Sequence, residues 1–135
     1  MPLSITLVNL LSIDYWTRKS GLAYSVGSFA FGYKTVKTKQ LIETIEGLIA
    51  EKNITGIVIG MPYNIDGTIS PHAQRVLSFA KTLEKRFWFP ITLHDERLTS
   101  SEAYLAFDEA EFEGDIDIES ARLILEGFIL KSLSD

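Results

Sequence analysis

Apolar and polar residues follow two different periods along the chain, and the two periods predict an alternation of strands and helices. Runs rich in Ile, Leu and Val predict buried strands, and short alternating runs predict half-buried ones. We expect five strands, at 4–14, 22–25, 29–34, 54–59 and 91–94. Apolar residues at helical spacing predict helices at 38–52, 71–86, after 99 and after 117. This order predicts an α/β fold with a mixed sheet, in which a hairpin comes first and right-handed βαβ crossovers follow.

Turn and capping residues separate these elements. Val26-Gly27 predicts a hairpin between the second and third strands. Thr38 is expected to cap the first helix and Asn53 to end it. Ser70-Pro71 is a strong start for the second helix, and residues 99–102 form a capping box that opens another one.

Three aromatic residues of the third strand share one face, because Phe29, Phe31 and Tyr33 are spaced two apart. They could stack on nucleobases, but packing within the sheet is the favoured interpretation.

Composition limits the class of protein. The 135 residues suit one domain, which we place at 1–135, and 46% of them are hydrophobic, enough for a real core. The chain has no cysteine, which excludes disulfides and thiolate zinc sites and fits a reducing cytosol. Met1-Pro2-Leu3-Ser4 lacks the basic segment of a signal peptide, and no apolar run approaches the ~20 residues of a membrane span. We therefore expect a cytoplasmic protein without a membrane partner.

The charge is acidic and unevenly spread. The net charge of -5 argues against a generic nucleic-acid binder. Residues 98–135 carry ten of the 18 Asp and Glu but only two of the 13 Lys and Arg. Such an acidic segment is most simply a solvated face, although it could also repel or mimic nucleic acid.

Carboxylates stand where the predicted strands end. Asp14 ends the first strand, Asp95 and Glu96 end the last one, and Asp117 shares a helix face with the apolar positions 121, 124 and 128. Because ligands of open α/β sheets gather at the carboxyl ends of strands, these groups are candidates to hold Mg²⁺ or Mn²⁺. Each also has a purely structural interpretation: Asp14 could cap a turn, Asp117 could be an N-cap, and Asp95 or Glu96 could pair with Arg97.

Other chemistries have weaker support. The only histidines, His72 and His94, lack the spacing of zinc ligands. The chain contains no P-loop, no G-x-G-x-x-G and no G-x-S-x-G motif.

Several motifs resemble one known family, in order and with natural spacing. They include Gly60-Met61-Pro62 and Asp95-Glu96-Arg97-Leu98-Thr99. The similar segments are 11–23, 57–62, 64–68, 73–80, 95–103 and 117–125. On these motifs the chain is identified as a member of the YqgF/RuvX family, whose proteins are described as Holliday junction resolvases and as pre-16S rRNA nucleases.

The resemblance implies an RNase H-like fold: a five-stranded mixed sheet in the order 3-2-1-4-5, flanked by helices, with Asp14 on the central strand. It also implies a nuclease in which carboxylates hold Mg²⁺ or Mn²⁺ and water attacks a phosphodiester of structured RNA or branched DNA. The catalytic acids map to Asp14, Glu96 and Asp117. The metal ligands map to Asp14, Asp95, Glu96 and Asp117. Contacts to nucleic acid map to Arg18, Lys19, Asn64 and Arg97. Since neighbours on a strand point to opposite faces, only one of Asp95 and Glu96 is expected to reach the site.

Two departures from the family pattern concern the substrate side. Trp16 stands where the family usually has Gly, and its indole could either block the substrate or stack on a base. Residues 108–115 are acidic where the family is often basic, which should weaken phosphate binding.

Three hypotheses follow. The first is a metal-dependent endonuclease that processes the 5′ end of precursor 16S rRNA or, second, resolves Holliday junctions, which would require a homodimer. The alternative is a catalytically weak RNase H-like module that binds RNA or a protein partner. Nucleotide binding is a minor third hypothesis, because the folds that place a similar motif after their first strand are larger and have a second domain.

Overall fold

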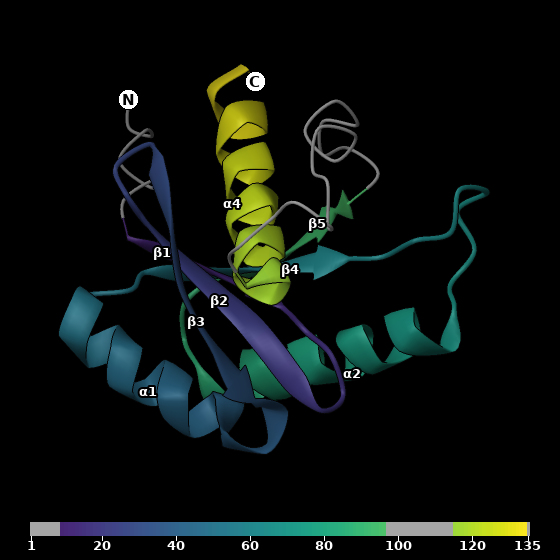
Figure 1. Ribbon diagram of the computed structural model, residues 1–135, viewed down its shortest axis with the longest axis horizontal. Helices are drawn as coiled ribbons and strands as arrows, with labels where there is room; N and C mark the ends of the chain where they lie inside the picture. The colour runs from purple at the N-terminus through teal and green to yellow at the C-terminus, as the bar shows by residue number, and fades with distance from the viewer. Residues whose placement is uncertain (1–8, 97–114, 135) are drawn as a thin grey trace.

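A five-stranded mixed sheet is the centre of the computed structural model, which describes residues 9–96 and 115–134 (Figure 1). The strand order is β3-β2-β1-β4-β5. The central strand β1 (Leu10–Asp14) pairs antiparallel with β2 (Lys19–Val26) and parallel with β4 (Gly56–Met61). The edge strands are β3 (Phe29–Lys37), antiparallel to β2, and β5 (Ile91–Asp95), parallel to β4. The predicted α/β class and strand order are confirmed.

The bounds of the strands differ from the predicted ones by a few residues. The hairpin turns where expected, because Val26 pairs with Phe29 and Gly27 adopts a φ of +61°. Strand β4 begins at Gly56 rather than Ile54, because the Ile54 N–H bonds back to the Ile49 carbonyl at the helix end. The described part of the first strand begins at Leu10, and the expected residues 4–8 lie outside the described residues.

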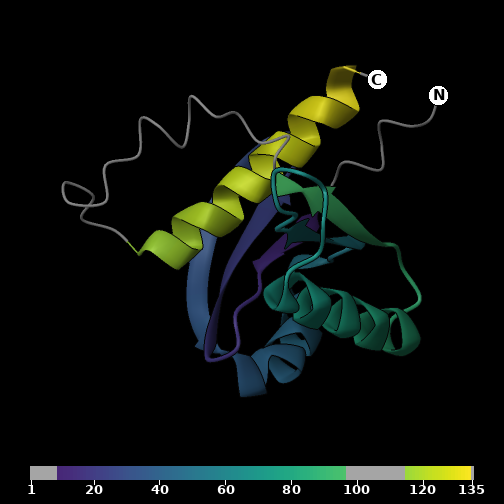
Figure 2. The ribbon, with the colours of Figure 1, turned by 90° about the vertical axis from the view of Figure 1, so that its right-hand side faces the viewer.

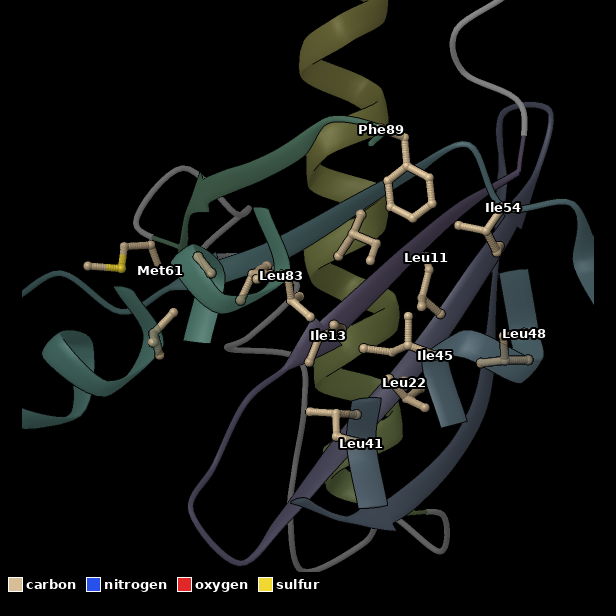
Figure 3. Packing of buried hydrophobic residues seen from close by; sticks show 14 of the residues in the cluster. Leu11, Ile13, Leu22, Leu41, Ile45, Leu48, Ile54, Met61, Leu83 and Phe89 are labelled. Atoms are coloured by element: carbon tan, nitrogen blue, oxygen red, sulfur yellow. The ribbon is translucent and has the colours of Figure 1, made fainter. Parts of the chain in front are cut away.

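Helices cover both faces of the sheet. Helices α1 (Leu41–Lys52) and α2 (Pro71–Arg86) lie on one face and α4 (Ile116–Ser134) on the other, as Figure 2 shows. Side chains alternate along β1, so Leu11 and Ile13 point to the first face, into the cluster in Figure 3. Leu10 and Ser12 point to the α4 face, where the Ser12 hydroxyl donates to the Ala121 carbonyl at 2.7 Å. None of the helices in the described part of the chain is long and apolar enough to cross a bilayer.

Most of the predicted helix ends are confirmed, with one exception. The Ser70 hydroxyl accepts the Ala73 N–H at 3.1 Å, and Asn53 ends α1 with a φ of 54°. The prediction that Thr38 caps α1 was wrong. Thr38 begins a short 3-10 helix, Thr38–Gln40, and its hydroxyl donates to the Trp16 carbonyl instead of accepting an N–H of the helix. The capping box at 99–102 lies outside the described residues.

Helix α4 buries the expected stripe. Ala121, Ile124 and Leu125 are fully buried, and Phe128 packs against them. The alternative role of Asp117 as N-cap was wrong, because the Asp115 carboxylate accepts the N–H groups of residues 117 and 118, at 2.8 and 3.2 Å. Asp117 lies within the first turn, which leaves its carboxylate free of the capping role.

The aromatic residues of β3 do not all pack within the sheet. Tyr33 packs against the core under α1, as favoured, but Phe29 is 70% exposed and Phe31 46% exposed. Both lie toward the hairpin end of an edge strand. Phe31 still packs against its cross-strand partner Tyr24, with ring centroids 5.6 Å apart, so the favoured interpretation is wrong only for Phe29.

Candidate active site

Strand β1 carries Asp14 to the carboxyl edge of the sheet, on the face covered by α4. Asp14 follows Leu10 and Ser12 in the alternation, so its side chain lies on their face. It is 7% exposed, although it is an acid. A carboxylate so far from water is costly unless something compensates its charge.

Helix α4 brings Asp117 to the same edge. The Asp115 carboxylate caps the helix and also accepts the Thr35 hydroxyl at 2.8 Å, which ties the start of α4 to β3. Gly21 of β2 allows the close approach, because a Cβ there would lie 2.0 Å from the Asp117 carbonyl oxygen. The Asp117 side chain is 22% exposed, and its Oδ2 lies 3.7 Å from Lys19 Nζ.

Glu96, rather than Asp95, faces the same side as Asp14. Ile91 and Leu93 pack on the α1–α2 face, whereas His94 packs edge-on against Phe128 of α4. By alternation Asp95 belongs with the former and Glu96 with the latter. The Glu96 carboxylate lies over Gly60, where a Cβ would be 2.6 Å from Oε1. The structure therefore brings Asp14, Glu96 and Asp117 to one face and places Asp95 beside them on the other.

The electrostatics indicate a cluster of carboxylates that repel one another. Burial, opposed by the Trp16 hydrogen bond and reinforced by the charge of Asp117, raises the pKa of Asp14 to about 6. Burial and the charges of Asp14 and Asp95 raise the pKa of Glu96 to about 7. A nearby cation would lower the pKa values of both groups, since a positive charge favours the ionised form of a carboxyl.

Trp16 covers the edge next to Asp14. Its indole N–H donates to Asp14 Oδ2 at 3.0 Å, and its ring stacks on His72 of α2 with centroids 4.2 Å apart. The buried Ser20 hydroxyl accepts the Trp16 backbone N–H at 3.2 Å, and the Thr38 hydroxyl donates to the Trp16 carbonyl at 2.5 Å. The indole is thus held in place from both its backbone and its ring.

The residues expected to contact nucleic acid are scattered. Arg18 is exposed in the turn after β1, while Lys19 already faces Asp117. Asn64 closes its own loop, because its side-chain amide donates to the Thr68 hydroxyl at 2.9 Å. That loop projects beyond the sheet between β4 and α2 (Figure 1). Arg97 lies outside the described residues.

The carboxylates are chemically suited to Mg²⁺ or Mn²⁺, because both ions prefer oxygen ligands and these three acids supply only oxygen. Within residues 9–96 and 115–134, no three His, Asp or Glu side chains form a ready coordination cluster. One oxygen of Asp14 instead accepts the Trp16 N–H. Holding an ion would therefore require the carboxylates to draw together, while the Trp16 N–H takes one of the acceptor positions of Asp14.

Sequence reasoning missed three residues that shape this site. Gly21 and Gly60 make room for Asp117 and Glu96, and His72 supports Trp16. A glycine inside a buried strand was the available signal for the first two, since such positions often mark a close approach. No sequence signal connects His72 to Trp16, because 56 positions and five elements separate them.

Comparison with known proteins gives a consistent result. The family model described as "RuvX: Holliday junction resolvase" matches residues 8–131. A Halothermothrix orenii protein named "Putative pre-16S rRNA nuclease" is 33% identical over 132 residues, covering 90% of this chain and 94% of its own length. Proteins of the same name from Maridesulfovibrio salexigens and Rhodobacter capsulatus are 35% and 34% identical, and the alignments cover 100% and 82% of their lengths.

A solved structure supports the fold independently. The structure described as "T. thermophilus RuvC in complex with Holliday junction substrate" matches with a TM-score of 0.62 over 94% of this chain and 96% of that chain. The two sequences are only 10% identical, so the likeness concerns the fold alone. With the strand order, it confirms the predicted RNase H-like architecture.

Proposed function

The chain belongs to the RuvX family, and on that premise we propose that it is a divalent-metal-dependent endonuclease acting on structured nucleic acid. The observation that carries the proposal is a pair of poorly solvated carboxyls on one face of the sheet, the buried Asp14 and the half-buried Glu96. Burial raises their pKa values to about 6 and about 7, and the charge of Asp14 adds to the shift of Glu96. Acids whose pKa values are raised by burial and by neighbouring carboxylates are typical of functional sites.

Asp14, Glu96 and Asp117 would hold Mg²⁺ or Mn²⁺, with Asp95 as the outer neighbour. The ion would supply charge stabilisation for the attacking and leaving oxygens of a phosphodiester. The protein's own contribution is rigid placement: β1 fixes Asp14, the Thr35–Asp115 contact fixes the start of α4, and Gly60 seats Glu96. Lys19 and Arg18 would steer the phosphate backbone toward this edge.

We propose precursor 16S rRNA as the first substrate, with processing at its 5′ end. This choice rests on the names of the relatives that align over most of their length. It places the protein in ribosome biogenesis and hence in the cytoplasm. Holliday junction resolution is the second choice, after the family description, and would require a homodimer that cuts two strands symmetrically.

The test is cleavage of a precursor 16S rRNA fragment and of a four-way DNA junction, each with Mg²⁺, with Mn²⁺ and with a chelator. We expect cleavage only with the ions, and a loss of about 100-fold or more in Asp14→Asn and Glu96→Gln, as when one preorganised electrostatic group is removed. Glu43→Gln is the matched control, because Glu43 is an exposed acid of α1 on the other side of the sheet. Equal activity with chelator, or full activity of Asp14→Asn, would contradict the proposal.

A catalytically weak RNA-binding module is the second candidate. The Trp16 N–H favours it, because that bond stabilises the ionised Asp14 and so reduces its need for a cation. The same assay separates the two: binding of the RNA fragment without ion-dependent cleavage of either substrate would select the module.

A further inference from the structure

An aromatic pair stands at the edge of the proposed site with one member open to solvent. Trp16 and His72 stack with ring centroids 4.2 Å apart and an interplanar angle of 13°. Trp16 is nevertheless 47% exposed, although a Trp ring is among the largest apolar surfaces a side chain can present. An indole that is stacked on one side and exposed elsewhere can take a further flat ring.

This platform is rigid before any ligand arrives. The Trp16 backbone is held by Ser20 and Thr38, and its indole N–H by Asp14. A fixed ring loses little side-chain entropy when a ligand stacks on it. The indole also reaches a proposed catalytic carboxylate directly, so a ring bound there would lie next to the site.

A pocket of mixed polar and apolar lining lies along α2. Its volume is about 360 Å³, and it is lined by Tyr15, Gln74, Arg75, Ser78, Phe79 and Thr82. Tyr15 precedes Trp16 in the chain, and Arg75 lies one turn after His72, so the pocket lies next to the platform. Burial and the nearby charge of Arg75 lower the pKa of His72. Tyr15 and Phe79 stack at 4.6 Å. Within the described residues Arg75 forms no ion pair, and its guanidinium is exposed.

We propose that Trp16 and His72 form a stacking subsite for an unpaired nucleobase, and that Arg75 binds the phosphate of the neighbouring nucleotide. Aromatic rings that take bases, combined with a cation for the backbone, are the standard means of binding single-stranded nucleic acid. The inference rests on the proposed function in that the bound strand would lead to Asp14. It specifies an unpaired segment beside the cleavage site, which a fully paired duplex does not offer.

The chain offers a direct optical probe of this subsite. It contains two tryptophans, and Trp88, 90% exposed in the connection between α2 and β5, can be replaced. In the Trp88→Phe protein the tryptophan fluorescence, excited selectively over the tyrosines, comes from Trp16 alone. We would titrate this protein, with chelator present, with short single-stranded RNA, the same sequence in DNA, and matched oligomers that carry abasic sites.

We expect saturable quenching by the oligomers that carry bases and an affinity about 5- to 150-fold lower for the abasic ones, the range of one stacked base. Trp16→Ala should lose the preference for bases, measured by anisotropy of a labelled oligomer, and Trp16→Phe should keep most of it while losing the N–H to Asp14. If Trp16→Ala does not fold, Trp16→Phe and His72→Ala still test the platform. The RNA and DNA arms show which strand is preferred.

The phosphate contact has its own readout. Arg75→Gln should reduce the slope of log affinity against log salt by about 0.7, the value for one phosphate of a single strand. Lys81→Gln is the matched control, because it removes an exposed cation from the same helix outside the pocket. An unchanged slope in Arg75→Gln would contradict its role.

Three results would overturn the subsite: equal affinity for abasic oligomers, no binding of any single strand, or tighter binding by Trp16→Ala, which would make the indole a block. These results are distinct from failure of the nuclease proposal. Base-dependent binding without cleavage would support the stacking subsite and contradict the nuclease proposal. Ion-dependent cleavage with equal affinity for abasic oligomers would support the nuclease proposal and contradict the stacking subsite.

Discussion

Gly21 and Gly60 show at the scale of single residues how the acids come together. A Cβ on Gly21 would meet the Asp117 carbonyl group, with its oxygen at 2.0 Å and its carbon at 2.4 Å. A Cβ on Gly60 would meet Ile124 Cδ1 at 2.5 Å and Glu96 Oε1 at 2.6 Å. The first clash is with backbone, which cannot turn aside, and the second is with the ends of flexible side chains. Gly21 is therefore needed for the packing of α4 on the sheet, and Gly60 for the position of the Glu96 carboxylate.

We expect Gly21→Ala to lower the free energy of unfolding by about 2–3 kcal/mol, because α4 must shift off the sheet. Gly60→Ala should cost less stability but displace the Glu96 carboxylate, and therefore reduce cleavage more than stability. Gly47→Ala is the control, since a Cβ there meets nothing within 4 Å and the residue lies inside α1. It should be neutral or stabilising by up to about 1 kcal/mol. Urea unfolding with the cleavage assay distinguishes these outcomes; a Gly21→Ala protein as stable as Gly47→Ala would refute the argument.

At the scale of elements, the start of α4 is the part that has to be positioned. The helix begins at Ile116, one residue before the acid it presents. Asp115 closes its first turn with two hydrogen bonds from N–H groups and receives a third from the Thr35 hydroxyl of β3. One side chain thus both caps the helix and fixes it to the edge strand. Asp117 depends on this contact for its place near Asp14.

Asp115→Ala should therefore lower the free energy of unfolding by about 1 kcal/mol, the usual cost of a lost N-cap, and reduce cleavage through misplaced Asp117. Asp115→Asn keeps a capping oxygen and should restore most of the stability. Thr35→Val removes only the link to β3 and should affect cleavage more than stability. The comparison uses urea unfolding and the rRNA assay, and a stable Asp115→Ala protein would show that the cap is dispensable.

At the scale of the whole molecule, bringing the acids together lowers the free energy of unfolding at neutral pH. The pKa of Asp14 rises from 3.8 to about 6 and that of Glu96 from 4.5 to about 7. Between about pH 4 and pH 7 the unfolded chain releases these protons first, so the folded protein binds more protons than the unfolded one. The free energy of unfolding must then fall as the pH rises through this window.

Asp14→Asn should consequently be more stable than wild type at pH 8, by up to about 3 kcal/mol, because it removes a shift of about two pKa units. At pH 4 and below, the two proteins should be nearly equal. Urea unfolding at both pH values with a chelator present measures the difference, and Glu43→Gln should show none of it. A wild-type protein that gains stability between pH 4 and pH 7 relative to Asp14→Asn would contradict the raised pKa.

Much of this architecture can be predicted from the sequence, because hydrophobic periodicity and turn residues are local signals. The pattern predicted the hairpin at Gly27, the second helix from Ser70 to Arg86, and the buried stripe of the last helix. The family motifs predicted the strand order. Local patterns also placed Asp14, Asp117 and the 95–96 pair at the ends of their elements. That placement was enough to make them candidate metal ligands.

Local sequence patterns do not predict which distant segments come into contact. Thr38 and Asp117 have the chemistry of caps, yet Thr38 bonds to Trp16 and Asp115 caps α4, because the packed neighbours set those bonds. The exposure of Phe29 and Phe31 follows from a place at the sheet edge, which periodicity does not encode. The nearness of Glu96 to Asp14 and the stacking of Trp16 on His72 likewise arise only when β1, β5 and α2 meet at the carboxyl edge of the sheet. Sequence thus supplies each side chain and its element, while packing decides which side chains meet.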